Sequence, residues 1–219
     1  MQLQHTLTEL TAIAAQHDPH FPASLQAGLS RADLQAELDA AGFVHRPPQE
    51  WFALYGWHNG SVQPDKQPFD TPLFHYHCFL PVEAALAEWT WRMETNRHEP
   101  DFPLFELFEP NLLPVFEFEG EFYCIECGDT EQPRAPVWFD FHGSILCYDS
   151  LHAMLEAKLE CHQTEGIYVR DADGWEDCAD EAACAIDPPM NSEKMWKALE
   201  KEALQAYKNH IYRDSRSRA

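Results

Sequence analysis

The chain has 219 residues, of which 45% are hydrophobic and 13% aromatic. This length and apolar content allow a sizeable core, which excludes global disorder and predicts one domain with additions or two small ones. Its 37 Asp and Glu against 15 Lys and Arg give a formal net charge of −22. Such a surface repels nucleic-acid phosphates and anionic membranes, so the composition argues against both as partners and favours a basic protein partner.

Cysteine usage and the N-terminal sequence predict a cytoplasmic protein. The N-terminal residues lack the basic and apolar regions of a secretory signal, and no apolar run approaches the length of a membrane span. An odd number of cysteines in a chain of this size favours reduced thiols over a disulfide framework. The seven are Cys78, Cys124, Cys127, Cys147, Cys161, Cys178 and Cys184.

Three helices are predicted in the first 60 residues. Apolar residues at helical spacing from Leu3 to Ala14 predict the first helix. Ser30 is suited to cap the second helix, and Gly42 is suited to end it. Residues 47–60 open with two prolines and close with Asn59-Gly60, which predicts a short aromatic helix that ends in a turn.

The middle of the chain predicts a strand, a helix and a β-hairpin. Residues 73–80 are strand-like, and Pro81 begins a helix whose apolar side runs from Val82 to Met93. Residues 115–125 form two strands around a Glu-Gly or Gly-Glu turn. The hairpin face expected to meet the core carries Phe116, Phe118, Tyr123 and Ile125. The reverse face, with Glu117, Phe122, Cys124 and Glu126, is expected to be mixed and partly exposed.

Two further strands, at residues 136–141 and 144–148, complete a meander of four. Ser150 is suited to cap the next helix, residues 166–169 are predicted as an edge strand, and a last helix is predicted from about Ser192. The order of elements predicts an α+β fold. It should contain a small, twisted, mainly antiparallel sheet of four to six strands flanked by helices.

Four segments resemble, in their order, the SUKH superfamily, the Smi/Knr-type fold shared by fungal cell-wall regulators, the bacterial Syd protein and many toxin-immunity proteins. They are the proline-initiated helix of residues 47–60, the strand-to-helix step of 79–89, the paired strands of 115–127, and the last strands and closing helix of 137–155. The resemblance implies a SUKH-like domain at residues 30–165. An N-terminal helical extension would occupy residues 1–29, and residues 166–219 would be an acidic loop and a C-terminal helix packed on the domain.

Cysteines and histidines at short spacing suggest metal sites, but each pattern also has a plainer structural interpretation. Cys124-x-x-Cys127 has the spacing of half a zinc site, which Cys147 or Cys161-His162 could complete. Strand alternation points the first two thiols to opposite faces, which favours buried core cysteines. His75-x-His77 would place two imidazoles on one strand face, but without a third ligand at diagnostic spacing two semi-exposed histidines are favoured.

The acidic stretch from Asp171 to Asp187 contains no Lys or Arg. Its Asp171-x-Asp173-Gly174 resembles the start of a calcium loop, but the later ligands are out of register. Trp175 lies inside the stretch, and an aromatic residue beside acids is typical of a contact surface for Lys and Arg. A mobile solubilising loop is the plainer alternative. The candidate partner-contact residues are Glu117, Glu119, Asp171, Asp173, Trp175, Glu176 and Asp177.

No nucleophile elbow, phosphate-binding Gly loop, dinucleotide fingerprint or zinc-protease helix occurs in the sequence, so we predict a non-catalytic protein-binding domain without a cofactor or metal. The resemblance implies an immunity protein that neutralises a cytoplasm-entering toxin, often a nuclease. Two alternatives stay open. The protein could be a scaffold or regulator in cell-envelope or signalling pathways, or an enzyme with a metal site built from His75, His77 and nearby cysteines.

Overall fold

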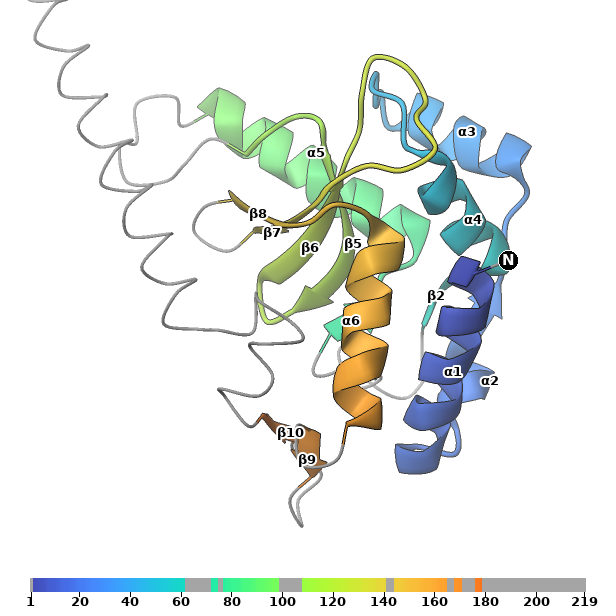
Figure 1. Cartoon of the computed structure of the whole chain (residues 1–219). Helices are drawn as coiled ribbons and strands as arrows, with labels where there is room; N and C mark the ends of the chain where they lie inside the picture. Colours follow the sequence, from blue (N-terminus) through green and yellow to red (C-terminus); the bar gives the residue numbers. More distant parts are fainter. Residues whose placement is uncertain are drawn as a thin grey trace, which may run out of the picture.

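The computed structural model describes residues 2–61, 72–74, 77–98, 108–140, 144–164, 168–170 and 176–178, and Figure 1 shows how their elements are arranged. The helices are α1 (Gln2–His17), α2 (Phe21–Ser24), α3 (Arg31–Ala40), α4 (Gln49–Trp57), α5 (Val82–His98) and α6 (Leu151–Gln163). The strands are β1 (Leu25–Ala27), β2 (His58–Ser61), β3 (Pro72–Phe74), β4 (His77–Phe79), β5 (Leu112–Phe118), β6 (Glu121–Glu126), β7 (Val137–Asp140), β8 (Ser144–Tyr148), β9 (Tyr168–Arg170) and β10 (Glu176–Cys178).

The main sheet has six antiparallel strands in the order β3-β4-β5-β6-β7-β8. Each strand pairs with its neighbour in sequence, as expected where short connections join antiparallel strands. This topology confirms the predicted α+β fold and its mainly antiparallel sheet. Six strands is the upper end of the predicted range of four to six.

The single strand predicted over residues 73–80 is wrong, because the chain reverses within it. β3 and β4 are two short strands that pair with each other, with Phe74 opposite His77. The reversal places β3 at the edge of the sheet and lets β4 pair with β5. His75 lies outside the described residues.

β5 and β6 form the predicted hairpin, with Phe118 opposite Glu121. This register leaves Glu119 and Gly120 as the two turn residues, whose φ angles are 47° and 90°. Positive φ at both central residues is typical of the tight turns that match the twist of a hairpin.

Helices cover both faces of this hairpin. Three of the four residues predicted to meet the core are buried, namely Phe116, Tyr123 and Ile125. The reverse face was expected to be partly exposed, and this expectation is wrong for most of its residues. α5 packs against β5 on that side, and the residues buried there are Glu117, Phe122 and Cys124.

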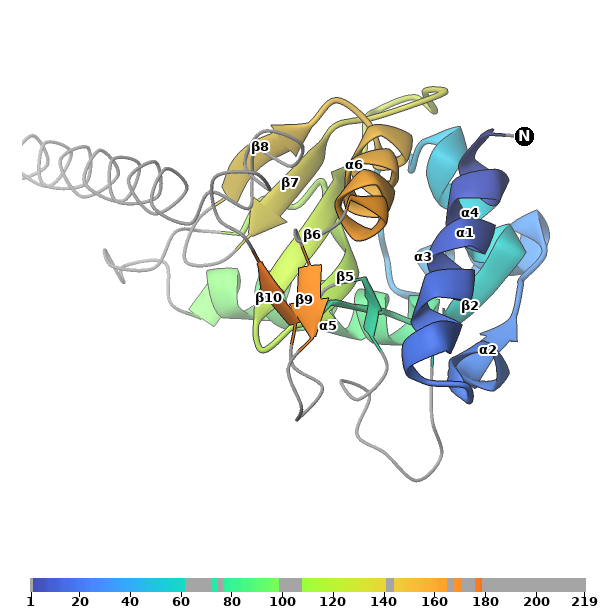
Figure 2. The same ribbon diagram turned by 60° about the horizontal axis from the view of Figure 1, so that its bottom comes forward.

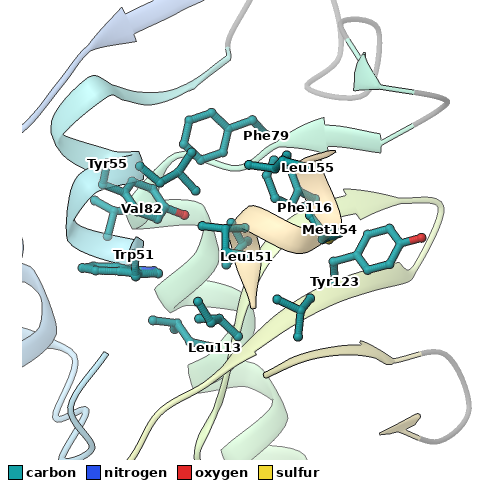
Figure 3. Packing of buried hydrophobic residues seen from close by; sticks show 14 of the residues in the cluster. Trp51, Tyr55, Phe79, Val82, Leu113, Phe116, Tyr123, Leu151, Met154 and Leu155 are labelled. Atoms are coloured by element: carbon teal, nitrogen blue, oxygen red, sulfur yellow. The ribbon is translucent and has the colours of Figure 1, made fainter. Parts of the chain in front are cut away.

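The sheet lies between α5 on one face and α6 on the other, with α1 beside α6 (Figures 1 and 2). Figure 3 shows side chains from α4, α5, α6 and the sheet meeting in the main core. Leu7, Leu10 and Phe21 belong to the same core. The N-terminal segment that the sequence set apart as an extension therefore shares its hydrophobic core with residues 30–165.

Two predicted helix caps are confirmed. Ser30 Oγ accepts a hydrogen bond from the Asp33 N–H (3.2 Å), and Ser150 Oγ accepts one from the Ala153 N–H (3.0 Å). Each satisfies a backbone donor that has no partner inside its helix. Gly42, with a φ of 71°, follows the end of α3 as predicted.

The remaining short strands form two separate two-stranded sheets. Asn59 and Gly60 lie in β2, which pairs with β1, rather than in a simple turn. β9 pairs with β10 and is not an edge strand of the main sheet, which corrects the prediction for residues 166–169. The helix predicted from Ser192 lies outside the described residues.

Candidate functional site

Acidic residues and an aromatic ring lie together on α5 and at the β5–β6 turn, where Trp91, Glu94 and Glu119 are exposed and Glu88 is half-buried. Glu88, Trp91 and Glu94 are spaced by three residues, so they lie along one side of α5. Trp91 is 55% exposed, and Val44 is the one other large hydrophobic residue so exposed in the described part of the chain. Glu119 is exposed at the tip of the turn. We call Glu88, Trp91, Glu94 and Glu119 the acidic-aromatic surface.

Glu117 holds the turn that carries Glu119. Its Oε1 accepts a hydrogen bond from the Gly120 N–H (2.9 Å). Glu117 was predicted to contact a partner directly, but it is only 5% exposed. This is a correction, and its cause is that α5 covers the β5 face on which Glu117 lies. Of the two contact residues predicted in the hairpin, Glu119 is the exposed one.

The buried side chain of Arg92 joins α5 to the sheet beneath this surface. Its Nε donates a hydrogen bond to Glu88 Oε1 (2.8 Å), and its Nη1 forms an ion pair with Asp140 on β7. The guanidinium carbon lies 4.3 Å from the centroid of the Phe122 ring and 4.7 Å from that of Phe108. These contacts fix the position of the helix, and with it the side chains on the outer side.

The ring of Trp91 packs against the ring of Phe108. The centroids of the two rings are 6.0 Å apart. Asn96 holds the Phe108 backbone with two hydrogen bonds, because its Nδ2 donates to the Phe108 carbonyl (2.8 Å) and its Oδ1 accepts from the Phe108 N–H (3.0 Å). Trp91 therefore rests on a fixed ring while more than half of its surface stays exposed.

Negative charge is crowded around the β5–β6 turn. Burial raises the pKa of Glu117; the Gly120 N–H opposes this rise, and the carboxylates of Glu88 and Glu119 add to it. Burial also raises the pKa of Glu121, and Glu119 raises it further. A positive charge placed here would relieve the mutual repulsion of these carboxylates.

The other predicted contact residues lie in the C-terminal acidic stretch. Asp171, Asp173 and Trp175 fall outside the described residues. Glu176 and Asp177 lie in β10, where they pair with Arg170 and Val169 of β9. The side chains of these five residues lie outside what the structure describes.

Cys124 and Cys127 are both buried, in two different hydrophobic clusters. Cys124 belongs to a small cluster with Ala85 of α5, whereas Cys127 belongs to the main core. Their burial confirms the predicted buried core cysteines. Burial raises the pKa of both thiols, so both are protonated at neutral pH.

His77 is buried rather than semi-exposed as predicted. Its ring centroid is 4.7 Å from that of Tyr123 and 5.8 Å from that of Phe74. Lys158 of α6 is buried beside them, and its Nζ donates a hydrogen bond to the Tyr123 hydroxyl (2.9 Å). Among the described residues, no group of three or more His, Cys, Asp or Glu side chains is arranged to hold a metal ion.

A hollow of about 370 Å³ lies between the α3–α4 region and the residues that follow β6. Arg46 and two acidic residues, Asp129 and Glu131, line it together with Phe52. Arg31 forms an ion pair with Glu131 at this hollow. Because both signs of charge occur in it, the hollow has no clear preference for an anion or a cation.

Trp91, Glu88 and Glu94 were missed as site residues in the sequence. A usable signal was present, because the apolar side predicted for α5 runs from Val82 to Met93 at helical spacing and Trp91 lies off that stripe. A large aromatic residue off the apolar stripe is a candidate for an exposed contact. The supporting role of Phe108 had no sequence signal, because it depends on a contact between separate segments.

None of the described helices combines the length and the apolar character needed to cross a bilayer. No model of a known protein family matches the chain, and no curated protein matches it.

Proposed function

We propose that the protein is a non-catalytic protein-binding domain that acts as an immunity-type inhibitor of a toxin in the cytoplasm. The observation that carries this proposal is Trp91, which is 55% exposed on α5 between Glu88 and Glu94. Trp is among the residues most enriched at the centres of protein interfaces, and a rim of carboxylates favours a basic partner. An exposed Trp beside carboxylates is what a contact surface for a basic partner would present.

A toxin that cleaves nucleic acid is the partner class that fits this charge best. A nuclease must hold a phosphate backbone in a cationic groove. Carboxylates on a fixed helix and turn, such as Glu94 and Glu119, can occupy such a groove in place of phosphates. The order of segments that resembles the SUKH superfamily supports the same function, because many members of that superfamily are immunity proteins.

The cytoplasm is the proposed place of action. Five cysteines in the described residues carry free thiols, and a reducing compartment keeps thiols in this state. A toxin that acts on intracellular nucleic acid would be met in the same compartment.

Coexpression with a neighbouring toxin gene tests the proposal. The toxin domain encoded beside this gene is expressed in a host cell with and without the protein, and growth, nuclease activity and copurification are measured. We expect the protein to restore growth and to form a stable complex with the toxin domain. A protein that neither binds nor inhibits a neighbouring toxin would contradict the proposal, and stoichiometric zinc in the purified protein would overturn its non-catalytic part.

Association kinetics test the role of charge. We expect the association rate constant to fall steeply with added salt, since steering by a surface of this charge is screened within about 10 Å at 0.1 M salt. An association rate that does not respond to salt would exclude steering even if the complex is tight.

A further inference from the structure

Arg92 shows how this fold accommodates a buried arginine. Its guanidinium carbon lies 4.3 Å from the centroid of the Phe122 ring, and its Nη1 pairs with the Asp140 carboxylate. The aromatic face and the carboxylate complement the planar cation, because a guanidinium can stack and donate hydrogen bonds at the same time.

Arg31 repeats this arrangement at the surface. Its guanidinium carbon lies 4.0 Å from the centroid of the Phe52 ring, and it forms an ion pair with Glu131. Arginine on an aromatic ring with a carboxylate partner is therefore used twice in the described part of the chain, once buried and once exposed.

Trp91 and Glu94 provide the aromatic face and a carboxylate of the same arrangement without the cation. Glu94 is exposed one helical turn after Trp91, whereas Glu88, one turn before it, already accepts a hydrogen bond from Arg92. No Lys or Arg lies over the Trp91 ring among the side chains that the structure describes. Indole is the aromatic ring that binds cations most strongly.

A buried carboxylate next to this surface also has one oxygen without a hydrogen-bond partner among the described residues. Glu117 is 5% exposed, and its Oε2 has no hydrogen-bond partner in the described part of the chain. Glu117 lies within electrostatic reach of both Glu88 and Glu119. Buried polar atoms are usually paired, so this oxygen adds uncompensated negative charge beneath the acidic-aromatic surface.

We propose that the acidic-aromatic surface receives an arginine side chain of a basic protein partner, with its guanidinium stacked on Trp91 and paired with Glu94. This inference rests on the proposed function and specifies how the partner is recognised. Arginine fits better than lysine because its planar, weakly hydrated guanidinium stacks on indole and can pair with a carboxylate through two parallel hydrogen bonds.

The test uses two synthetic peptides that are identical except that every basic residue is arginine in one and lysine in the other. Their affinities for the full-length protein are measured by calorimetry at the same salt concentration. We expect the arginine peptide to bind about twofold to fivefold more tightly, the range that one exposed cation–π contact provides. Trp91→Leu should remove this preference and leave the affinity for the lysine peptide nearly unchanged.

Two further variants separate this contact from general charge attraction. Trp91→Phe keeps an aromatic face and should retain part of the preference for arginine. Glu156→Gln with Glu160→Gln removes two exposed charges from α6, on the other face of the sheet, and should weaken both peptides equally. Glu94→Gln should weaken the arginine peptide more than this control does.

Equal affinity for the two peptides, or a preference that survives Trp91→Leu, would overturn the inference, as would failure of the arginine peptide to bind. Isotope-labelled protein gives a second measurement, since the indole N–H signal that disappears in Trp91→Phe should shift on addition of the arginine peptide. If Trp91→Leu still inhibits a neighbouring toxin fully, the recognition mode is wrong while the proposed function stands. If the protein prefers the arginine peptide but binds no toxin, the recognition mode stands while the proposed function is wrong.

Discussion

Asn59 on β2 caps helix α5, although 23 residues separate it from Val82. Its Oδ1 accepts a hydrogen bond from the Val82 N–H (2.9 Å), and its Nδ2 donates to the Glu83 carboxylate (3.1 Å). The first N–H groups of a helix have no partner within it, so a buried side chain from another element satisfies one of them here. The same contact fixes where α5 begins, and therefore helps to fix the position of Trp91 on that helix.

Replacement of Asn59 by Ala should lower the free energy of unfolding by about 1–2 kcal/mol, because the Val82 N–H would lose its partner in a buried position. Urea denaturation followed by circular dichroism measures this change. Gln4→Ala, an exposed polar substitution on α1, is the matched control and should have an effect within about 0.5 kcal/mol. An N59A variant as stable as the wild type would show that the cap does not contribute.

Gly60 follows Asn59, and its replacement by Ala should destabilise the protein more than replacement of Gly42, although the two glycines have similar φ angles. Gly42 and Gly60 have φ angles of 71° and 77°. A Cβ on Gly42 would meet no atom within 4 Å, whereas a Cβ on Gly60 would overlap the backbone of Pro81. Gly42→Ala should therefore lose only the backbone term of about 1–2 kcal/mol, and Gly60→Ala should lose about 2 kcal/mol more. Thermal unfolding of the two variants compares them, and equal losses would contradict the steric argument.

Local signals in the sequence were sufficient for the helices and the meander. Ser30 and Ser150 lie directly before the helices they cap, so the sequence alone places them. Asn59 lies in a strand and caps a helix that is distant in sequence. The pair Asn59-Gly60 is common in turns, so the sequence alone predicted a turn there. The reversal between β3 and β4 was missed for a similar reason, since pairing with β5 decides it.

The site was only partly predictable for the same physical reason. Glu119 follows from the turn, because any short hairpin exposes its tip. Glu117 was assigned to a partly exposed face because the packing of α5 on that face is a tertiary contact without a local signal. Trp91 could have been selected from its position off the apolar stripe of α5, but its fixed position depends on Phe108 and Asn96.

The ion pair between Arg92 and Asp140 should matter far more to stability than its exposed counterpart between Arg31 and Glu131. Arg92→Met would leave the buried Asp140 carboxylate without its cation, and loss of one partner of a buried pair typically costs about 3–5 kcal/mol. Arg31→Met changes the same type of side chain at a site where ion pairs contribute about 0–1 kcal/mol. Chemical denaturation of both variants tests this difference.

A double-mutant cycle separates the ion pair from the lost packing of Arg92. The double variant Arg92→Met with Asp140→Asn should be less destabilised than the sum of the two single variants, because removal of both charges leaves no unpaired one. Simple additivity of the two effects would show that the charges do not interact in the folded protein.

The raised pKa of Glu117 predicts an unusual dependence of the free energy of unfolding on pH. Its pKa is raised in the folded protein, chiefly by burial, so the folded state binds this proton more tightly than the unfolded state does. The free energy of unfolding contributed by Glu117 therefore rises as pH falls through its folded pKa, and it is lowest at neutral pH, where the carboxylate is charged. Most carboxylates that are paired in the folded state have a lowered pKa, and their contribution to the free energy of unfolding is lost as pH falls.

Glu117→Gln isolates this contribution, because the amide oxygen can still accept the hydrogen bond from Gly120. At pH 7 the variant should be more stable than the wild type by about 1 kcal/mol, since it removes a buried charge among other carboxylates. The difference should shrink as pH is lowered from neutral, because the raised pKa lets the wild-type carboxyl take up its proton in the folded state before the unfolded state does. Glu37→Gln, on the exposed side of α3, changes the net charge equally and is the control. A difference between Glu117→Gln and the wild type that stays constant with pH would show that Glu117 is not the strained charge at the turn.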